Sequence, residues 1–193
     1  MNKVFFDLEW NTGFLDGNSF DEIIEIGAVK TDEEYRQIDG FRRLIRPVIY
    51  RKMNPYIQKI LAITMKDLQG EEPLASVVKA FFDWCGDCDT LIAWSGNDFG
   101  VLEKNLAHIG MKIPEQLGRY DVQMAYAYRT ENSIRNYALK TAVEAMELPE
   151  PEGQEYHDAY CDAQFTAAIG RALTERYGPL PAVEELQALK NTL

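Results

Sequence analysis

The chain has 193 residues, 46% of them hydrophobic, and a formal net charge of −11. This length and apolar content predict one globular domain, because no Gly/Ser/Pro-rich linker or internal repeat divides the sequence. No apolar run approaches the roughly 18 residues of a membrane helix, and acidic residues interrupt the apolar N-terminal segment, so we expect neither a membrane helix nor a signal peptide. We therefore expect a cytoplasmic protein, and its three cysteines fit a reducing compartment.

Residues 3–10 are apolar and aromatic and predict a β-strand that contains two acids, Asp7 and Glu9. Side chains of a strand alternate between its faces, so these two carboxylates point the same way. They repel each other, and a divalent cation that prefers oxygen ligands would relieve the repulsion. The alternative is the solvated outer face of an edge strand.

Two further strands are expected over residues 23–29 and 41–45, in a meander with an acidic turn at residues 31–34. Residues 54–62 and 73–85 predict helices. The segment 41–60 contains no acid and concentrates six basic residues: Arg42, Arg43, Arg46, Arg51, Lys52 and Lys59. One interpretation is a surface that follows a phosphate backbone, and the other is a solvated strand and loop.

Cys85 and Cys88 have the CxxC spacing of zinc and redox sites. Such sites need a second ligand pair or a thioredoxin-like setting, and the chain has only one more cysteine and two histidines. We favour the end of the amphipathic helix, with Gly86 as its C-terminal cap.

Residues 91–94 predict a strand that begins the parallel part of the sheet, and a helix pattern follows it. Asp98 lies at this junction. Asn97 and Asp98 are favoured helix N-caps, so a structural cap and a metal ligand are both open for Asp98. Farther on, Ser133 is expected to cap a helix that ends at Leu148-Pro149.

The Pro- and Gly-containing segment 149–155 predicts a mobile loop that leads to His157. His157 and Asp162 would lie about 140° apart on a single helix. The spacing therefore favours His157 in the loop and Asp162 in the first turns of the next helix. Asp158 would share a face with Asp162, where their like charges need a cation or partner. Alone, His157 would be an ordinary polar residue.

Three motifs in this order resemble the histidine-containing branch of the DEDD exonucleases (DEDDh), within the DnaQ-like, ribonuclease-H-like superfamily. They are Asp7-Leu8-Glu9, Asn97-Asp98, and the segment from His157 to Asp162. The resemblance covers about residues 3–175 and is closest to the Eri-like and KapD-like branch. One departure is Leu61-Ala62-Ile63-Thr64, where many relatives have Thr-Gly-Ile-Thr.

The resemblance implies an α/β, ribonuclease-H-like three-layer fold, with a mixed five-stranded sheet flanked by helices. The exonuclease domain would comprise residues 1–178. Residues 179–193 would be a C-terminal tail, which we expect to form a short helix.

The implied activity is metal-dependent 3′-to-5′ hydrolysis at the 3′ end of single-stranded RNA or DNA, releasing nucleoside 5′-monophosphates. Two Mg²⁺ or Mn²⁺ ions are expected, because an all-oxygen site suits hard cations. The implied metal ligands are Asp7, Glu9, Asp98 and Asp162. The implied general base is His157, since an imidazole titrates near neutral pH.

The resemblance implies contacts of Leu8, Glu9 and Ile26 with the terminal nucleotide, and the aromatic residues Phe99 and Tyr156 are further candidate contacts. Phe99 and Tyr156 have a packing role as the alternative, and Trp10 is expected in the core because alternation sends it away from the carboxylates.

A second functional class is a catalytically idle exonuclease-like fold that binds nucleic acid or regulates another protein. The intact carboxylate cluster favours the enzyme, because keeping such a cluster unpaired is costly.

The charge of −11 is unusual for a nucleic-acid enzyme. Two bound divalent ions would reduce it to about −7 at the site of the scissile phosphate. The composition therefore suits a substrate held by its end.

Overall fold

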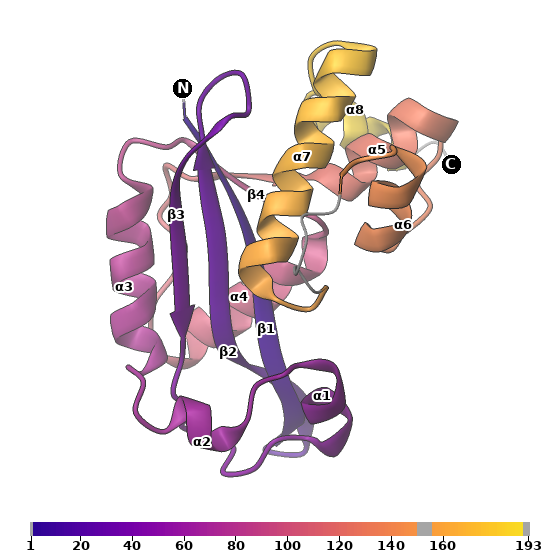
Figure 1. The fold of residues 1–193 in the computed structure, drawn as a ribbon. Helices are drawn as coiled ribbons and strands as arrows, with labels where there is room; N and C mark the ends of the chain where they lie inside the picture. Colours follow the sequence, from indigo (N-terminus) through magenta and orange to yellow (C-terminus); the bar gives the residue numbers. More distant parts are fainter. Residues whose placement is uncertain (1, 150–155, 191–193) are drawn as a thin grey trace.

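The computed structural model describes residues 2–149 and 156–190. Its centre is a mixed five-stranded sheet in the order β3-β2-β1-β4-β5, with helices on both faces (Figure 1). This architecture confirms the predicted ribonuclease-H-like fold. Most of the predicted mobile loop, residues 150–155, lies outside the described residues.

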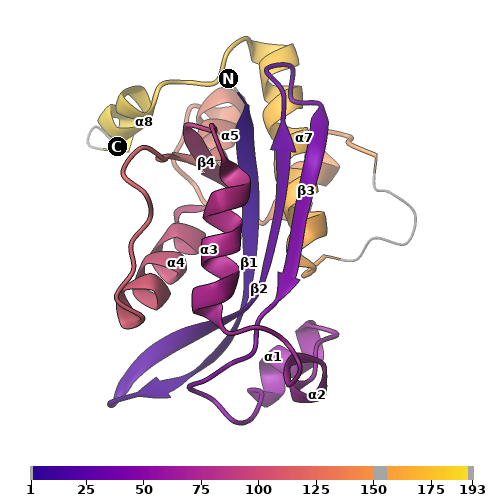
Figure 2. The ribbon, with the colours of Figure 1, turned by 90° about the vertical axis from the view of Figure 1, so that its left-hand side faces the viewer.

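The first three strands form an antiparallel meander, and the last two run parallel to the first. β1 and β2 are longer than predicted, because they continue as a hairpin beyond the rest of the sheet (Figure 2). The hairpin turns at Asp16-Gly17, and both residues have positive φ angles. The strands are β1 Lys3–Leu15, β2 Asn18–Thr31, β3 Gln37–Leu44, β4 Thr90–Ala93 and β5 Gly118–Asp121.

Eight helices are assigned in the described ranges: α1 Pro55–Ile60, α2 Met65–Leu68, α3 Leu74–Cys85, α4 Gly96–His108, α5 Val122–Glu131, α6 Leu139–Ala145, α7 Ala159–Tyr177 and α8 Val183–Lys190. α7 lies across one face of the sheet, and α3 and α4 cover the other (Figures 1 and 2).

The alternation of β1 divides the core into two layers. Val4, Phe6 and Leu8 pack with the helices on the α3 and α4 side, whereas Phe5 packs with α7 on the other side. Asp7 is two residues after Phe5 on the same strand, so its side chain points to the same face, the one that α7 covers.

The region between β5 and α7 differs from the prediction. A helix that the sequence analysis missed, α5, ends at Asn132, which adopts the left-handed conformation of a helix C-cap. Ser133 follows this cap and does not begin a helix. α6 begins only at Leu139, after Ala138.

The CxxC segment ends α3, as expected. Gly86 is the C-cap with a φ of 63°, which a residue with a Cβ adopts rarely. Cys85 and Cys88 are buried and free, and burial raises the pKa of the Cys85 thiol to about 12. These thiols therefore stay protonated and shielded from solvent.

The segment after α7 forms the short helix α8, whose Leu186 is buried against the α7 side of the core. The hydroxyl of Tyr120 donates to the carbonyl of Pro181 at 2.8 Å and ties this segment to β5. In the part of the chain that the structure describes, no helix is both long and apolar enough to cross a membrane.

Candidate active site

The first strand supplies two carboxylates in the middle of the sheet. β1 lies between β2 and β4, so the alternative of a solvated edge strand is wrong. The β1–β2 register shifts between Glu9 and Trp10, which leaves Ile24 of β2 without a partner. Such a bulge bends the strands and re-aims side chains. Trp10 packs against the core as expected, and it also lines the cavity in front of Asp7 and Glu9.

Asp98 comes from the start of α4 and is 5% exposed. The N-cap of this helix is Ser95, whose hydroxyl accepts from the N–H of Asn97, so the cap interpretation of Asp98 is wrong. Its carboxylate instead accepts from the hydroxyl of Ser95 at 3.4 Å and from the backbone N–H of Leu8. These bonds join the start of α4 to the strand that carries Asp7.

The third segment is the start of α7. Asp158 is the N-cap, and its Oδ1 accepts from the N–H of Cys161 at 3.1 Å. His157 precedes the helix, is exposed, and has a φ of 69°. Its backbone N–H donates to Oδ2 of Asp162 at 3.2 Å. The prediction of a histidine before the helix and an aspartate in its first turn is confirmed.

These three segments meet at one cavity of about 300 Å³. One ligand atom from each of Glu9, His157 and Asp162 lies within 4.8 Å of the other two. Asp7 and Asp98 also line the cavity, so all five residues of the predicted constellation border it: Asp7, Glu9, Asp98, His157 and Asp162.

Burial, and then repulsion between the carboxylates, disfavours their ionised forms. Burial, and then the charges of Asp98, Asp162 and Glu9, raise the pKa of Asp7 well above its ordinary value. Burial is also the main cause that raises the pKa of Glu9 to about 8 and those of Asp98 and Asp162 to about 7. The site therefore needs positive charge to be fully ionised near neutral pH.

Divalent cations fit this site. Oδ1 of Asp162 is buried, and within the described ranges it has no hydrogen-bond partner. A buried carboxylate oxygen without a donor carries a desolvation cost that a cation would remove. The donors are carboxylate oxygens with one imidazole nearby, which suits Mg²⁺ or Mn²⁺ and provides no thiolate for a softer metal.

Sequence comparison identifies the family. The model of the RNase_T family, described as an exonuclease, matches residues 4–169. The chain belongs to the RNase_T exonuclease family. A DNA polymerase III of the PolC type from Clostridium perfringens (strain 13 / Type A) is 29% identical over 169 residues, which are 86% of this chain. The match covers 11% of that polymerase, so the likeness concerns one small part of it.

Solved structures with this fold include DEDDh 3′-exonucleases. The nuclease domain of 3′hExo, a DEDDh family member bound to rAMP, has a TM-score of 0.79 and 17% identity. The alignment covers 93% of this exonuclease and 94% of that chain. Exonuclease I of E. coli, in complex with a dT13 oligonucleotide, has a TM-score of 0.69 and 17% identity, and the alignment covers 91% and 41% of the two chains. At these identities the likeness shows the fold.

Not all of the predicted substrate contacts line the cavity of this RNase_T exonuclease. Leu8 and Glu9 do. Ile26 is 0% exposed, and it pairs with Leu8 across the strands in the core on the α3 and α4 side. It is absent from the lining of this cavity, and its contact with the nucleotide stays a prediction. Phe99 is buried with its ring edge-to-face against Phe6, 5.1 Å between centroids, and is absent from the cavity lining.

Tyr156 packs against the core, which was the alternative to a nucleotide contact for this residue. Its ring stacks on Phe165 with 5.0 Å between centroids, and Lys140 lies over it. Tyr156 borders a neighbouring cavity of about 270 Å³, which also contains His157 and Arg42.

The sequence analysis missed the apolar wall of the acidic cavity. Ile57, Ile60 and Leu61, in and just after α1, line it together with the carboxylates. Their i, i+3, i+4 spacing was visible as part of a predicted helix. Nothing in that pattern indicated that this helix lies beside β1.

Proposed function

We propose that this chain is a metal-dependent DEDDh 3′-to-5′ exonuclease that releases nucleoside 5′-monophosphates from the 3′ end of single-stranded RNA or DNA. The observation that supports this proposal is the meeting of β1, α4 and the start of α7 at one cavity, with four carboxylates and a histidine in its lining. Membership of an exonuclease family agrees with it.

Asp7, Glu9, Asp98 and Asp162 would hold two Mg²⁺ or Mn²⁺ ions. When bound, such ions activate water and stabilise negative charge on a phosphoryl group undergoing displacement. The strand fixes Asp7 and Glu9, whereas hydrogen bonds to Ser95, Leu8 and the His157 backbone orient Asp98 and Asp162. The donors are thus largely positioned before any ligand arrives.

His157 acts as the general base. It is exposed at the mouth of the cavity, within reach of Glu9 and Asp162. An imidazole near neutral pH can accept the proton that an attacking water loses. The hydrogen bond from the His157 backbone to Asp162 holds the residue at the cavity while the ring remains accessible.

The cavity suits a single terminal nucleotide. Its volume of about 300 Å³ is at the lower end of the ~300–1,000 Å³ range of ligand pockets. Trp10 and Ile57 are among its apolar lining residues, on which a base can pack. Arg51, Lys52 and Lys59 precede or lie in α1 and are exposed, and they provide positive charge for the preceding phosphates.

Digestion of oligonucleotides with a 5′ fluorescent label tests the proposal. Single-stranded RNA and DNA should shorten stepwise from the 3′ end with Mg²⁺ or Mn²⁺, and EDTA should stop the reaction. Asp7→Asn should reduce the rate at least ~100-fold, since a misplaced or missing ligand costs about that much. The control is Asp16→Asn, the same substitution at the exposed hairpin turn, where Asn also tolerates the positive φ.

Two outcomes would contradict the enzyme proposal. One is an absence of metal-dependent shortening with either nucleic acid, which would favour the idle binding module. The other is an Asp7→Asn variant as active as the wild type. Thermal unfolding without metal checks that Asp7→Asn is folded, and its Tm should match or exceed that of the wild type, because one of the repelling charges is gone.

A further inference from the structure

Arg42 of β3 connects two acidic residues that lie on either side of the site. Its Nε donates to Oε1 of Glu25 at 2.8 Å, and its Nη2 pairs with Oδ2 of Asp158 at 2.6 Å. A guanidinium can bind two carboxylates at once because its N–H groups form a rigid planar fork.

Each of these acids is next to a residue of the site. Glu25 is 1% exposed and lies directly opposite Glu9 in the β1–β2 pairing. Asp158 follows His157 in sequence and caps α7. Arg42 therefore joins the strand beside Glu9 to the backbone immediately after His157.

The backbone at His157 needs such a restraint. A φ of 69° is unfavourable for a residue with a Cβ and persists only when surrounding contacts hold it. The His157 N–H bond to Asp162 is one such contact. The ion pair between Asp158 and Arg42 is the second, and it anchors the other side of the same turn to the sheet.

We propose that Arg42 is a positioning residue of the exonuclease site, which holds His157 in place through its ion pair with Asp158. This inference rests on the proposed function. It concerns a cationic side chain from the basic segment 41–60, for which the sequence left open either contact with phosphate or a solvated strand and loop. In the structure the Arg42 guanidinium is instead bound to two carboxylates of the protein.

Two substitutions break the ion pair from opposite ends. Asp158→Asn keeps a good N-cap, because Asn and Asp cap helices about equally well, and removes only the charge. Arg42→Gln removes the cation but also leaves the buried Glu25 without a positive charge beside it, with only the backbone hydrogen bond from Ala159. An effect that both variants share therefore comes from losing the ion pair between Arg42 and Asp158, and not from the change around Glu25.

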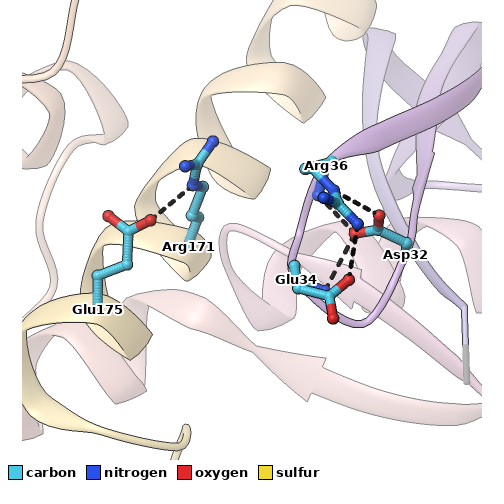
Figure 3. A network of polar contacts seen from close by, with 5 residues as sticks. All are labelled: Asp32, Glu34, Arg36, Arg171 and Glu175. Atoms are coloured by element: carbon cyan, nitrogen blue, oxygen red, sulfur yellow. Dashed lines mark hydrogen bonds and ion pairs between the residues drawn. The ribbon is translucent and has the colours of Figure 1, made fainter.

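A matched control lies on the same helix. Arg171 and Glu175 form an exposed ion pair at 2.7 Å on α7, separate from the Asp32, Glu34 and Arg36 cluster of the β2–β3 turn (Figure 3). Arg171→Gln removes an arginine ion pair without touching the segment that carries His157. It should change neither kinetics nor local dynamics, as expected for an exposed pair.

Steady-state kinetics on a single-stranded oligomer provide the first measurement. Arg42→Gln and Asp158→Asn should each lower kcat about 10- to 100-fold, with KM within about threefold, because a displaced general base affects the chemical step more than binding. The double variant should be no slower than the slower single variant. Arg42→Lys should recover little, because a single ammonium cannot reproduce both contacts.

Hydrogen exchange in the metal-free, substrate-free protein provides a second measurement that needs no activity. The amides of residues 157–162 should exchange about 10-fold faster in Arg42→Gln and Asp158→Asn, and at the wild-type rate in Arg171→Gln. Unchanged exchange in this segment would overturn the inference even in an active enzyme. Unchanged kcat, additive single effects, or full recovery in Arg42→Lys would also overturn it. If the wild type shows no nuclease activity but exchange responds as expected, the proposed function fails and the restraint by Arg42 stands.

Discussion

At Gly27 of β2, the backbone of α7 packs directly against the sheet. A Cβ added there would lie 2.1 Å from the backbone nitrogen of Tyr160 and 2.2 Å from the carbonyl carbon of Ala159. Because these are backbone atoms of the first helical turn, Gly27→Ala must move that turn by roughly 1 Å to restore a normal contact. We expect unfolding free energy to fall by about 1–3 kcal/mol, the usual cost of overpacking.

The same movement should separate Asp162 and His157 from the carboxylates of β1, which do not move with α7. A displacement of roughly 1 Å can cost about 100-fold in rate, so activity should fall far more than the loss of stability explains. Urea unfolding and oligonucleotide digestion at a temperature where the variant is fully folded separate the two effects. The control is Gly70→Ala, where an added Cβ meets nothing within 4 Å. A Gly27→Ala variant with wild-type stability and rate would refute the close packing of α7 on β2.

Two further predictions concern charge. Burial raises the pKa of Glu9 from 4.5 to about 8 and that of Asp162 from 3.8 to about 7, so the folded metal-free protein retains protons that the unfolded chain has lost. Its stability should therefore fall as pH rises from about 4 to about 8, by up to ~4 kcal/mol for a three-unit shift. Urea unfolding in EDTA measures this dependence, and an unfolding midpoint that rises with pH would contradict it. Added Mg²⁺ should stabilise the protein more at pH 8 than at pH 6. Glu22, 4% exposed, accepts three backbone N–H groups of residues 48–50. Glu22→Gln should cost about 1.5–3 kcal/mol in the same assay at neutral pH, against less than ~0.5 kcal/mol for the exposed Glu175→Gln, and equal values would contradict it.

The sequence predicted those parts of the site that depend on local periodicity. Alternation along β1 placed Asp7 and Glu9 on one face, and the five-residue spacing placed His157 before a helix and Asp162 inside it. The contact of Ile26 with the nucleotide was expected from resemblance alone. It stays a prediction, because Ile26 pairs with Leu8 in the core and is absent from the cavity lining.

What the sequence did not reveal depends on long-range contacts or on weak local signals. α5 has little amphipathic character and follows a strand of four residues, so its pattern gave no clear period. The N-cap of α4 is Ser95, three residues before Asp98, and the sequence did not single it out because several residues that favour N-caps follow one another there. The contact between Arg42 and Asp158 joins β3 to α7 and has no local signature at all.

The proposed site draws its members from β1, from the start of α4 and from the start of α7. About 150 residues of sequence separate the carboxylates of β1 from the start of α7. No short fragment of the fold can therefore contain the whole cavity, and local opening of the start of α7 would dismantle it without unfolding the sheet.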